Sequence, residues 1–551
     1  MTPQDTPKAP PVDAPILDIK GLTIALPGGL DRRHAVEDLS FRVHRRQIVC
    51  LVGESGSGKS VTASAVMSLL PKGTLKIVGG TITLDGESLI GASPERLCAL
   101  RGNRMAMVFQ EPLTALNPVM RVGDQIAEVL RIHRPQMTAG EIADRVRELM
   151  ADVHLPNPEA MRHVYPHQIS GGQRQRVMIA MALALEPSLI IADEPTTALD
   201  VTTQAQILRL FRELLSKHDS GILLITHDFG VVADVADHVV VMRHGRAVES
   251  GKPQAVLTAP SHPYTRLLID AVPRFHFRPP ETVGPEVALE VTNLRLTYRS
   301  SSFLGRRRET VALDDVSFFL AKGETLGIVG ESGSGKSSLA KTLLRFERPD
   351  SGEIRIGGTN IASLGGGELR RFRRTIQMIF QDPYASLNPR RKVGQSLLEG
   401  PIQHGVSRAD ALARVERLME MVGLNREALS RFPHEFSGGQ RQRICIARAL
   451  AMEPDIIVAD EPVSALDVSV QAQVLKLFED LRREIGFSMV FVTHDLRIAS
   501  NVCDRVAVMR RGQIVEIGRT EQIFRTPQHP YTQALIAAVP GQSVHADLLS
   551  A

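Results

Sequence analysis

Two strings of letters occur twice in this chain, and that repetition limits the possible folds more than any other feature. GESGSGKS stands at residues 53–60 and at 330–337, and SGGQRQR stands at 170–176 and at 437–443. The copies of the first string lie 277 residues apart and those of the second 267. Solenoid and propeller repeats span only about 20–50 residues, so this repeat is the duplication of a whole domain. We predict two homologous halves that differ by short insertions.

The segments around the repeats suggest where each half begins and ends. A chain of 551 residues is too long for a single hydrophobic core. AVPRFHFRPPETVGPEV, between the halves, combines prolines with polar residues and is typical of an extended linker. We predict a disordered tail at 1–15, a first domain at 16–272, a linker at 273–287, a second domain at 288–540 and a C-terminal tail at 541–551.

Hydrophobic patterning predicts the same α/β fold in each half. LDIKGLTIAL and LEVTNLRLTY alternate between apolar and polar residues, as strands of a half-exposed antiparallel sheet do. The runs IVCLV, SLIIAD and GILLIT, and their counterparts LGIV, DIIVAD and SMVFVT, are continuously apolar and favour strands buried on both faces of a parallel sheet. The segment from Val122 to Leu155 has helical spacing. We therefore expect a parallel core sheet, an antiparallel β part and a helical part in each half.

Composition excludes several classes of protein. The 65 Lys plus Arg nearly balance the 61 Asp plus Glu, which gives no argument for a nucleic-acid partner. Cys50, Cys98, Cys445 and Cys503 lie far apart, so neither a disulfide framework nor a zinc or iron–sulfur site is indicated. The first residues lack the apolar core of a secretory signal, and no apolar run reaches the roughly 20 residues of a membrane span. We expect an intracellular protein whose role at a membrane, if any, is peripheral.

The repeated octapeptide predicts a phosphate-binding loop. It matches GxxxxGK[ST], and each copy follows an apolar run and precedes a helical pattern, which is the context the motif requires. In such a loop the backbone N–H groups surround phosphates, the lysine reaches the β- and γ-phosphates, and the final hydroxyl binds Mg²⁺. A glycine-rich turn without a ligand would not explain two copies in this context. The predicted nucleotide-binding residues are Gly53, Glu54, Ser55, Gly56, Ser57, Gly58, Lys59 and Ser60, and Gly330, Glu331, Ser332, Gly333, Ser334, Gly335, Lys336 and Ser337.

Acidic pairs follow a predicted core strand in both halves. LIIADEP places Asp193 and Glu194 at a strand exit, and IIVADEP places Asp460 and Glu461 there. The aspartates suit the carboxylate that helps to hold Mg²⁺, and the glutamates are positioned to polarise an attacking water. A helix-capping Asp-Glu pair is the alternative, and the phosphate loop before it makes that less favoured.

A histidine and a glutamine recur at other strand ends. His227 and His494 stand in the context T-H-D after ILLIT and MVFVT, where an imidazole could bind phosphate. Gln110 and Gln381 end apolar stretches and enter proline-containing loops. Chemistry alone leaves these glutamines open between a surface role and a functional one.

The phosphate loop, the glutamine, SGGQ, the DE pair, ALD at 198–200 and 465–467, and the histidine, in that order, resemble the ABC-type ATPases over nearly the whole chain. The resemblance implies two tandem ABC-type P-loop ATPase domains that bind ATP and Mg²⁺. It makes Glu194 and Glu461 general bases, lets His227 and His494 hold the γ-phosphate and water, and places Asp200 and Asp467 at the interface between the halves. Ser60, Gln110, Asp193, Ser337, Gln381 and Asp460 would surround the metal, and both glutamines would relay its state to a membrane partner.

The resemblance also assigns the repeated heptapeptide. In ABC-type ATPases the SGGQ of one domain completes the nucleotide site on the other domain's phosphate loop. The physical reason is that SGGQ opens a helix, whose N-terminus favours an anion. Carried over, Ser437, Gly438, Gly439 and Gln440 would serve the nucleotide on Lys59, and Ser170, Gly171, Gly172 and Gln173 would serve the one on Lys336.

The two halves depart from each other at one family position. ABC-type ATPases usually stack adenine on an aromatic residue at the end of an early strand, and Tyr298 suits that place in the second half. Counting from the strand start puts Leu26 at the matching place in the first half. The first site would then lose a stacking contact of about 1 kcal/mol and bind ATP more weakly.

A narrower resemblance involves HPYT at residues 262–265 and 529–532. It is similar to the dipeptide, oligopeptide and nickel importers, and to their fused tandem type in glutathione and microcin-like peptide uptake. The implied protein is the ATP-hydrolysing subunit of a bacterial importer, at the cytoplasmic face of the inner membrane, with two polytopic permeases and a secreted solute-binding protein as partners. The alternative is a tandem ABC ATPase that acts on ribosomes or nucleic acid, but the short proline-rich linker argues against it. The transported solute is not readable from this chain.

Overall fold

The computed structural model describes residues 14–28, 32–71, 73–196, 199–277, 286–301, 307–464 and 466–541. Most of the predicted N-terminal tail, residues 278–285 of the predicted linker, Ala198, Ala465 and nearly all of the predicted C-terminal tail lie outside these residues. Among the described residues, 14–199, 203–270 and 540–541 belong to one compact unit, and 200–202 and 271–539 belong to a second. The domain boundaries drawn from the sequence stay predictions.

The strands of the first unit form two sheets. The antiparallel sheet has the strand order β2-β1-β4-β5, and the larger sheet has the order β10-β9-β3-β8-β7-β6. All neighbours in the larger sheet pair in parallel except β9 and β10. The strands are β1 Leu17–Ala25, β2 His34–Val43, β3 Ile48–Val52, β4 Lys76–Leu84, β5 Glu87–Ser88, β6 Met105–Val108, β7 Leu189–Asp193, β8 Gly221–Thr226, β9 His238–Arg243 and β10 Arg246–Gly251.

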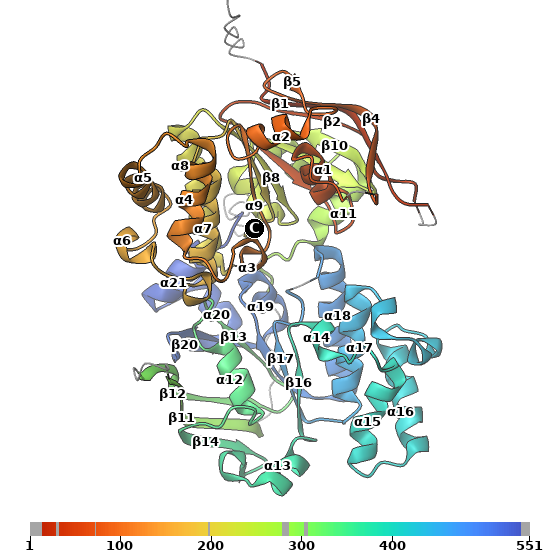
Figure 1. Ribbon diagram of the computed structural model, residues 1–551. Helices are drawn as coiled ribbons and strands as arrows, with labels where there is room; N and C mark the ends of the chain where they lie inside the picture. Colours follow the sequence, from red (N-terminus) through yellow and green to blue (C-terminus); the bar gives the residue numbers. More distant parts are fainter. Residues whose placement is uncertain are drawn as a thin grey trace, which may run out of the picture. The chain divides into compact units, whose positions relative to one another are not determined.

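The helices of the first half follow the predicted scheme. The predicted helical insertion is present as α4 and α5, which pack together with α7 on one side of the parallel sheet (Figure 1). The helices are α1 Lys59–Val66, α2 Pro94–Leu100, α3 Pro112–Ala115, α4 Val122–His133, α5 Ala139–Asp152, α6 Pro158–Met161, α7 Gly171–Leu183, α8 Val201–Lys217, α9 Phe229–Val235, α10 Pro253–Thr258 and α11 Pro263–Ala271, with a 3₁₀ turn at Pro166–Gln168.

The second half repeats both sheets, with the orders β12-β11-β14-β15 and β16-β17-β18-β13-β19-β20. Its strands are β11 Val287–Ser301, β12 Arg307–Ala321, β13 Thr325–Val329, β14 Ser351–Ile356, β15 Thr359–Asn360, β16 Ile376–Ile379, β17 Ile456–Asp460, β18 Ser488–Val492, β19 Arg505–Arg510 and β20 Gln513–Arg519. Its helices are α12 Lys336–Leu343, α13 Gly366–Phe372, α14 Pro383–Ser386, α15 Val393–Gln403, α16 Arg408–Met421, α17 Gly438–Leu450, α18 Val468–Ile485, α19 Leu496–Val502, α20 Thr520–Arg525 and α21 Pro530–Ala537, with 3₁₀ turns at Ile361–Ser363, Arg426–Ser430 and Pro433–Glu435.

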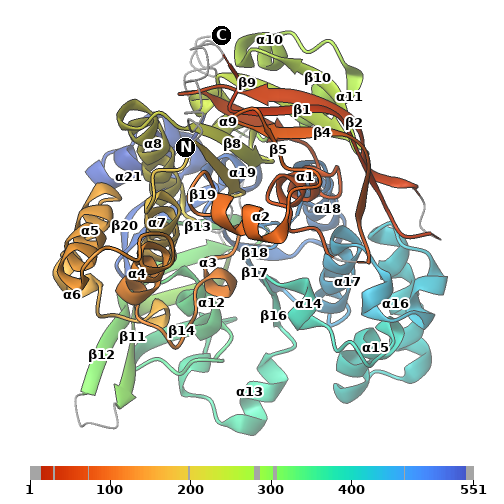
Figure 2. The ribbon, with the colours of Figure 1, turned by 45° about the horizontal axis from the view of Figure 1, so that its top comes forward.

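The core explains why the apolar runs predicted the central strands correctly. Every residue of β3, β7 and β8 is buried, as is every residue of β13, β17 and β18, because helices cover both faces of each parallel sheet. In contrast, β1 alternates between buried and more exposed positions. Its buried face packs over α1 within one apolar cluster, and Figure 2 shows this layer of antiparallel strands above the helix. The predicted fold class is confirmed.

The described start of the predicted linker packs against the second unit. The Phe275 and Phe277 rings lie 5.5 and 6.3 Å from the Phe524 ring, centroid to centroid. The Asn501 Nδ2 donates to the Arg274 carbonyl at 2.7 Å. Residues 274–277 are therefore fixed to α19 and α20.

Candidate active sites

The phosphate loops connect β3 to α1 and β13 to α12, and glycine is required at their first position. A Cβ added to Gly53 would lie 2.3 Å from the Met242 carbonyl oxygen, and one added to Gly330 would lie 2.3 Å from the Met509 carbonyl oxygen. Contacts that short do not occur between real atoms, so any side chain would displace the strand beside the loop. The loops then enter their helices through Gly58 and the corresponding glycine of the second half, at φ values of 106° and 107°, which favour glycine.

Each loop collects the groups that an anion needs. The Lys59 ammonium is buried and donates to the Gly53 carbonyl at 2.7 Å and to the Glu54 carbonyl at 2.9 Å. Lys336 makes the matching contacts in the second half, at 2.7 and 2.8 Å. Burial lowers the pKa of Lys336 from its usual range. A buried ammonium beside a helix N-terminus is a strong site for a phosphate group.

Two orphaned hydroxyls support the same ligand. The Oγ atoms of Ser57 and Ser334 are buried in the loops and have no hydrogen-bond partner among the described residues. A buried polar atom without a partner is destabilising, and a polar ligand that enters the loop would remove that cost. Because both halves leave the same loop hydroxyl without a partner, the loops fit a phosphate-bearing nucleotide.

The predicted metal ligands meet at the C-terminal edge of each parallel sheet. The Ser60 hydroxyl donates to Asp193 Oδ1 at 3.1 Å, and the Ser337 hydroxyl donates to Asp460 Oδ1 at 3.2 Å. Burial raises the pKa of both aspartates, against the opposing effect of these hydrogen bonds. Among the described residues, no three His, Cys, Asp or Glu side chains gather into a metal site. The donors present suit Mg²⁺, which is held by one or two carboxylates together with substrate phosphates.

The glutamate, glutamine and histidine predicted for the first site form one cluster. Gln110 Nε2 donates to Glu194 Oε2 at 2.8 Å, and His227 Nδ1 lies 3.3 Å from Glu194 Oε1. Glu194 itself has a φ of 45°, which is uncommon for a residue other than glycine and is often found at functional sites.

The second half reproduces this cluster. Gln381 Nε2 lies 2.9 Å and His494 Nδ1 lies 3.1 Å from Glu461 Oε2. Burial opposes ionisation of Glu461, but the hydrogen bond and charge of His494 outweigh it and lower the carboxyl pKa. For both histidines, burial lowers the pKa, yet the neighbouring glutamate outweighs burial and the net pKa is raised. An ionised carboxylate at this place can accept a proton from water.

SGGQ forms the start of α7 in the first half and of α17 in the second. The Ser170 hydroxyl accepts from the Gln173 N–H at 3.3 Å, while Gln173 Oε1 accepts from the Ser170 N–H at 3.0 Å. Ser437 and Gln440 form the same capping box at the same distances. This arrangement confirms the expected turn into a helix. The pairing of each SGGQ with the phosphate loop of the other half stays a prediction.

The two aspartates that were predicted to line the interface between the halves each stand directly before a long helix. Asp200 precedes α8 and accepts from the Thr202 hydroxyl at 2.8 Å, and Asp467 is the N-cap residue of α18. Their predicted interface role stays a prediction.

The strand register places Leu26 and Tyr298 at equivalent positions. Leu17 pairs with Leu84, and Leu289 pairs with Ile356, at matching points of the two antiparallel sheets. Leu26 and Tyr298 each follow those anchors by nine residues. Leu26 packs against the apolar core, whereas Tyr298 is 39% exposed, with its hydroxyl 3.4 Å from the Ser338 Oγ beside the phosphate loop.

Sequence reasoning missed one contact of each loop. Tyr264 and Tyr531, from the two HPYT motifs, reach the second residue of the phosphate loop in their own half. The signal in the sequence was the repetition of HPYT with the same 267-residue spacing as SGGQ. That spacing could have marked the motif as part of the repeated machinery.

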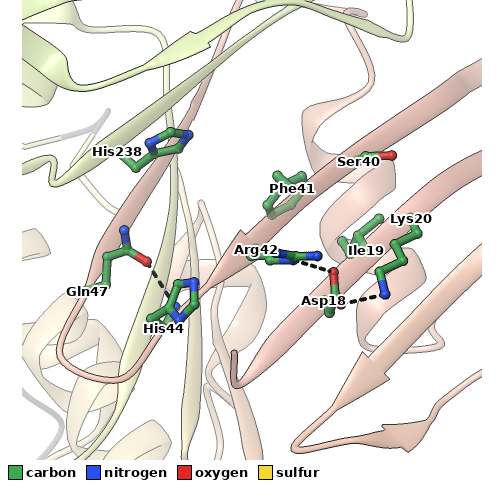
Figure 3. Close-up of a pocket in the computed structure, with 9 residues that line it drawn as sticks. All are labelled: Asp18, Ile19, Lys20, Ser40, Phe41, Arg42, His44, Gln47 and His238. Carbon is green, nitrogen blue, oxygen red and sulfur yellow. Dashed lines mark hydrogen bonds and ion pairs between the residues drawn. The ribbon is translucent and has the colours of Figure 1, made fainter. Parts of the chain in front are cut away.

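A hollow on the antiparallel sheet of the first unit belongs to a different surface. It encloses about 370 Å³ and is lined by residues that Figure 3 shows, among them Asp18, Lys20 and Arg42. Asp18 already pairs with both cations, at 3.1 Å to Lys20 Nζ and 3.2 Å to Arg42 Nε. None of the lining residues belongs to the phosphate loop, so this hollow is separate from the candidate site.

A phosphate loop, an acidic pair and a strand-end histidine on a parallel sheet define a P-loop ATPase, and this chain carries the set twice. Residues 36–197 and 313–464 match the ABC transporter family, and residues 248–309 and 515–550 match the oligopeptide/dipeptide transporter C-terminal region. The chain belongs to the ABC transporter family, as an ATP-binding, ATP-hydrolysing subunit. The alternative of a ribosome or nucleic-acid ATPase is not favoured.

Two relatives that carry a functional name are similar in sequence to this chain over nearly its full length. The glutathione import ATP-binding protein GsiA of Salmonella paratyphi A is 47% identical over 558 residues, covering 95% of this chain and 89% of that protein. The protein of the same name from Escherichia coli strain K12 is 47% identical over 563 residues, with the same coverage. A solved dimeric ATP-binding cassette bound to ADP and Pi is 29% identical, covers 42% of this chain and 98% of its own, and has a TM-score of 0.39.

Family membership has consequences for partners and location. An ATP-binding subunit of an ABC importer works with membrane permeases and is peripheral to the membrane. Within the described ranges, no helix combines the length and apolar character that crossing a bilayer requires.

Proposed function

We propose that this chain is the energy-coupling ATPase of a bacterial importer for peptides or related small solutes such as glutathione. The observation that carries the proposal is that both halves hold a complete set of phosphate loop, aspartate, glutamate, glutamine and histidine in contact with one another. The match to the oligopeptide transporter C-terminal region and the names of the relatives support the class of solute.

In the proposed mechanism the chain's residues position ATP and one water molecule. The loop N–H groups, Lys59 and Lys336 bind the phosphates. The water oxygen bonds to the γ-phosphorus, the bond to the β-phosphate oxygen breaks, and Glu194 or Glu461 accepts the proton from the water. His227 and His494 hold the γ-phosphate and the water in line.

A bound Mg²⁺ would neutralise charge that develops on the phosphate oxygens. We propose that it is held in the first half by Ser60, Gln110 and Asp193, and in the second half by the corresponding serine, glutamine and aspartate. The hydroxyl–carboxylate contacts described above support this set.

We further propose two polytopic permease subunits and a secreted solute-binding protein as partners, with the chain at the cytoplasmic face of the inner membrane. A cavity of about 1060 Å³ in the second unit supports the permease contact. Ser337, Gln381 and Asp460 line it together with Glu399 and Gln403 of α15. Gln381 therefore lies between the metal-binding side chains and the helical part, where it can relay the state of the site to a docked partner.

Uptake measurements test the transport proposal. In a strain that lacks the gene for this chain, the wild-type gene should restore ATP-dependent uptake of radiolabelled glutathione or of a dipeptide. A variant with both Glu194→Gln and Glu461→Gln should not. Uptake of both solutes that is unaffected by the deletion would contradict the proposal.

The same double variant tests the general bases in the purified chain. We expect ATP to bind with near-normal affinity while steady-state hydrolysis falls at least about a hundredfold, because the amide cannot accept the proton from water. Glu186→Gln with Glu453→Gln is the matched control, since these glutamates occupy equivalent exposed positions outside the sites. Near-normal turnover in the Glu194/Glu461 variant would refute the assignment.

A further inference from the structure

The HPYT motif of each half reaches the phosphate loop of that same half. The Glu54 N–H donates to the Tyr264 hydroxyl at 3.3 Å, and the Glu331 N–H donates to the Tyr531 hydroxyl at 3.2 Å. In the first half the Tyr264 hydroxyl also donates to Glu54 Oε2 at 3.1 Å. The same contact thus forms twice, across about 200 residues of sequence, at the second residue of each loop.

A chain of hydrogen bonds fixes the first tyrosine. On β10, Glu249 accepts from the Ser261 N–H at 2.8 Å and from the His262 N–H at 3.1 Å, which holds the turn before α11. His262 Nδ1 then accepts from the Tyr264 N–H at 3.1 Å and caps the helix. The histidine, proline and tyrosine of HPYT therefore act as a cap, a first helical residue and a side chain aimed at the loop.

The second half builds the same support. Glu516 on β20 accepts from the Gln528 N–H at 2.8 Å and from the His529 N–H at 3.1 Å. His529 Nδ1 accepts from the Tyr531 N–H at 3.1 Å. Because the network recurs in full, it is a property of the repeated motif and not of one local environment.

The aromatic rings of both tyrosines are also fixed, by burial and by a contact with an arginine. Tyr264 is 5% exposed and Tyr531 is 7% exposed. The Arg243 guanidinium carbon lies 4.7 Å from the Tyr264 ring centroid, and that of Arg510 lies 4.7 Å from the Tyr531 ring centroid. In the first half, Arg243 directly follows the residue whose carbonyl confines the first loop glycine. The end of β9 and Tyr264 therefore hold two adjacent residues of the loop, Gly53 and Glu54.

We propose that Tyr264 and Tyr531 are positioning residues, which hold the phosphate loop in its ATP-binding shape. This inference rests on the proposed role of the loops in ATP binding, and it gives HPYT a function in each half. The hydroxyl fixes the orientation of the peptide unit between the first two loop residues, so the N–H groups that follow are directed before ATP arrives. Burial raises the pKa of both hydroxyls to about 12, so each stays neutral at working pH.

Each hydroxyl contacts the second residue of its phosphate loop and not the reacting atoms, so its loss should change binding and not the chemical step. Without it, the loop samples conformations that do not bind ATP, and the apparent affinity falls with the population of the competent one. From the net worth of one hydrogen bond, we expect a rise of about three- to tenfold in the ATP dissociation constant.

The first experiment compares Tyr264→Phe with Tyr165→Phe. Both substitutions delete one hydroxyl, but the position of Tyr165 is occupied by Phe432 in the second half, so its hydroxyl is dispensable there. Each is introduced into full-length chain carrying Lys336→Ala, so that only the first site binds a fluorescent ATP analogue. Tyr264→Phe should weaken binding about three- to tenfold, and Tyr165→Phe should leave it unchanged.

Two further measurements distinguish positioning from general damage. In the chain with Tyr264→Phe and Tyr531→Phe, KM for ATP should rise while kcat at saturating ATP stays within about twofold. Amide exchange of the peptide covering residues 53–58 should accelerate, with no change in the melting temperature. An unchanged dissociation constant, or a fall in kcat without a rise in KM, would overturn the inference. Failure of the wild-type chain to bind ATP would instead refute the proposed function itself.

Discussion

Two opposing effects determine the pKa of the His227 imidazole. Burial alone lowers its pKa, because the protein interior disfavours the cation. The Glu194 carboxylate, 3.3 Å away, reverses the sign and raises the pKa above its usual value. The resulting ion pair stabilises the fold fully below a pH of about 6.5, and this contribution is lost as pH rises through the raised pKa.

We predict that Glu194→Gln reverses the pKa shift of His227, from raised to lowered. With the carboxylate gone, burial is the main remaining influence, so the His227 pKa should fall below about 6.5. NMR titration of histidine-labelled protein without nucleotide measures it, and a His227→Asn spectrum assigns the signal. His238 is an internal reference, because burial alone lowers its pKa and the substitution does not touch it. A raised His227 pKa in the variant would show that another group holds the proton.

Residues at strand ends were predictable, whereas contacts across the chain were not. Asp193 ends the buried strand β7, Glu194 follows it and His227 follows β8, and the C-terminal ends of such parallel strands meet at one edge of the sheet. The sequence pattern alone therefore predicted that these three side chains lie close together. The contact between Glu54 and Tyr264 joins residues 210 positions apart, and no local periodicity encodes it.

At the scale of elements, the two glycines of SGGQ serve different purposes. A Cβ added to Gly171 would meet its nearest neighbour, Leu199, at 3.7 Å, which is ordinary contact. A Cβ added to Gly172 would lie 2.4 Å from Thr203 Cγ2 on α8. In the second half, a Cβ on Gly439 would lie 2.3 Å from Val470 Cγ1 on α18. The second glycine thus lets two helices of the same half approach closely.

We expect Gly172→Ala to destabilise the fold and Gly171→Ala to leave stability nearly unchanged. The β-branched Thr203 side chain is stiff, so relief of the clash requires helix movement, at about 1–3 kcal/mol. For a domain of this size that is a fall of several degrees in melting temperature, measured by calorimetry on the full chain. Gly439→Ala and Gly438→Ala repeat the comparison in the second half. Equal melting temperatures for the two variants of a pair would contradict this packing role.

Elements themselves were easier to predict than their packing. The alternating segment that begins at Leu17 is β1, and the apolar runs are the central parallel strands, because burial on one face or on two imposes those patterns. SGGQRQR was predicted as a turn into a helix, which α7 and α17 confirm. The close approach of α7 to α8 was not foreseen, since a glycine pair before a helix equally suits a phosphate ligand.

At the scale of the whole molecule, duplication has preserved the cluster of glutamate, glutamine and histidine, while its surroundings have changed. Position 42 on the first antiparallel sheet is an arginine paired with Asp18, whereas its counterpart Phe319 lies under Arg505, with 4.3 Å between the guanidinium carbon and the ring centroid. Arg42 lines the hollow of Figure 3, so the duplication has not preserved the side chains of that surface. Leu26 and Tyr298, at equivalent positions of the two antiparallel sheets, show the same divergence beside the candidate nucleotide sites.

We predict that the two sites bind ATP unequally. With Lys336→Ala only the first site remains, and with Lys59→Ala only the second. The first should bind ATP about fivefold more weakly, since Leu26 cannot provide the roughly 1 kcal/mol of aromatic stacking that Tyr298 offers to adenine. Equilibrium binding of a fluorescent ATP analogue to the two single-site proteins measures the difference.

Tyr298→Leu should abolish that difference by making the second site resemble the first. Its side chain lies beside the phosphate-loop helix, with the hydroxyl 3.4 Å from Ser338 Oγ, so the substitution removes an aromatic surface where adenine would stack. Phe319→Leu removes an exposed ring from the same sheet, away from the loop, and should leave ATP affinity unchanged. If the single-site proteins bind equally, or if Tyr298→Leu has no effect, adenine does not stack there. The two halves would then be equivalent in binding despite their divergence, and any functional asymmetry of the molecule would have to arise after ATP has bound.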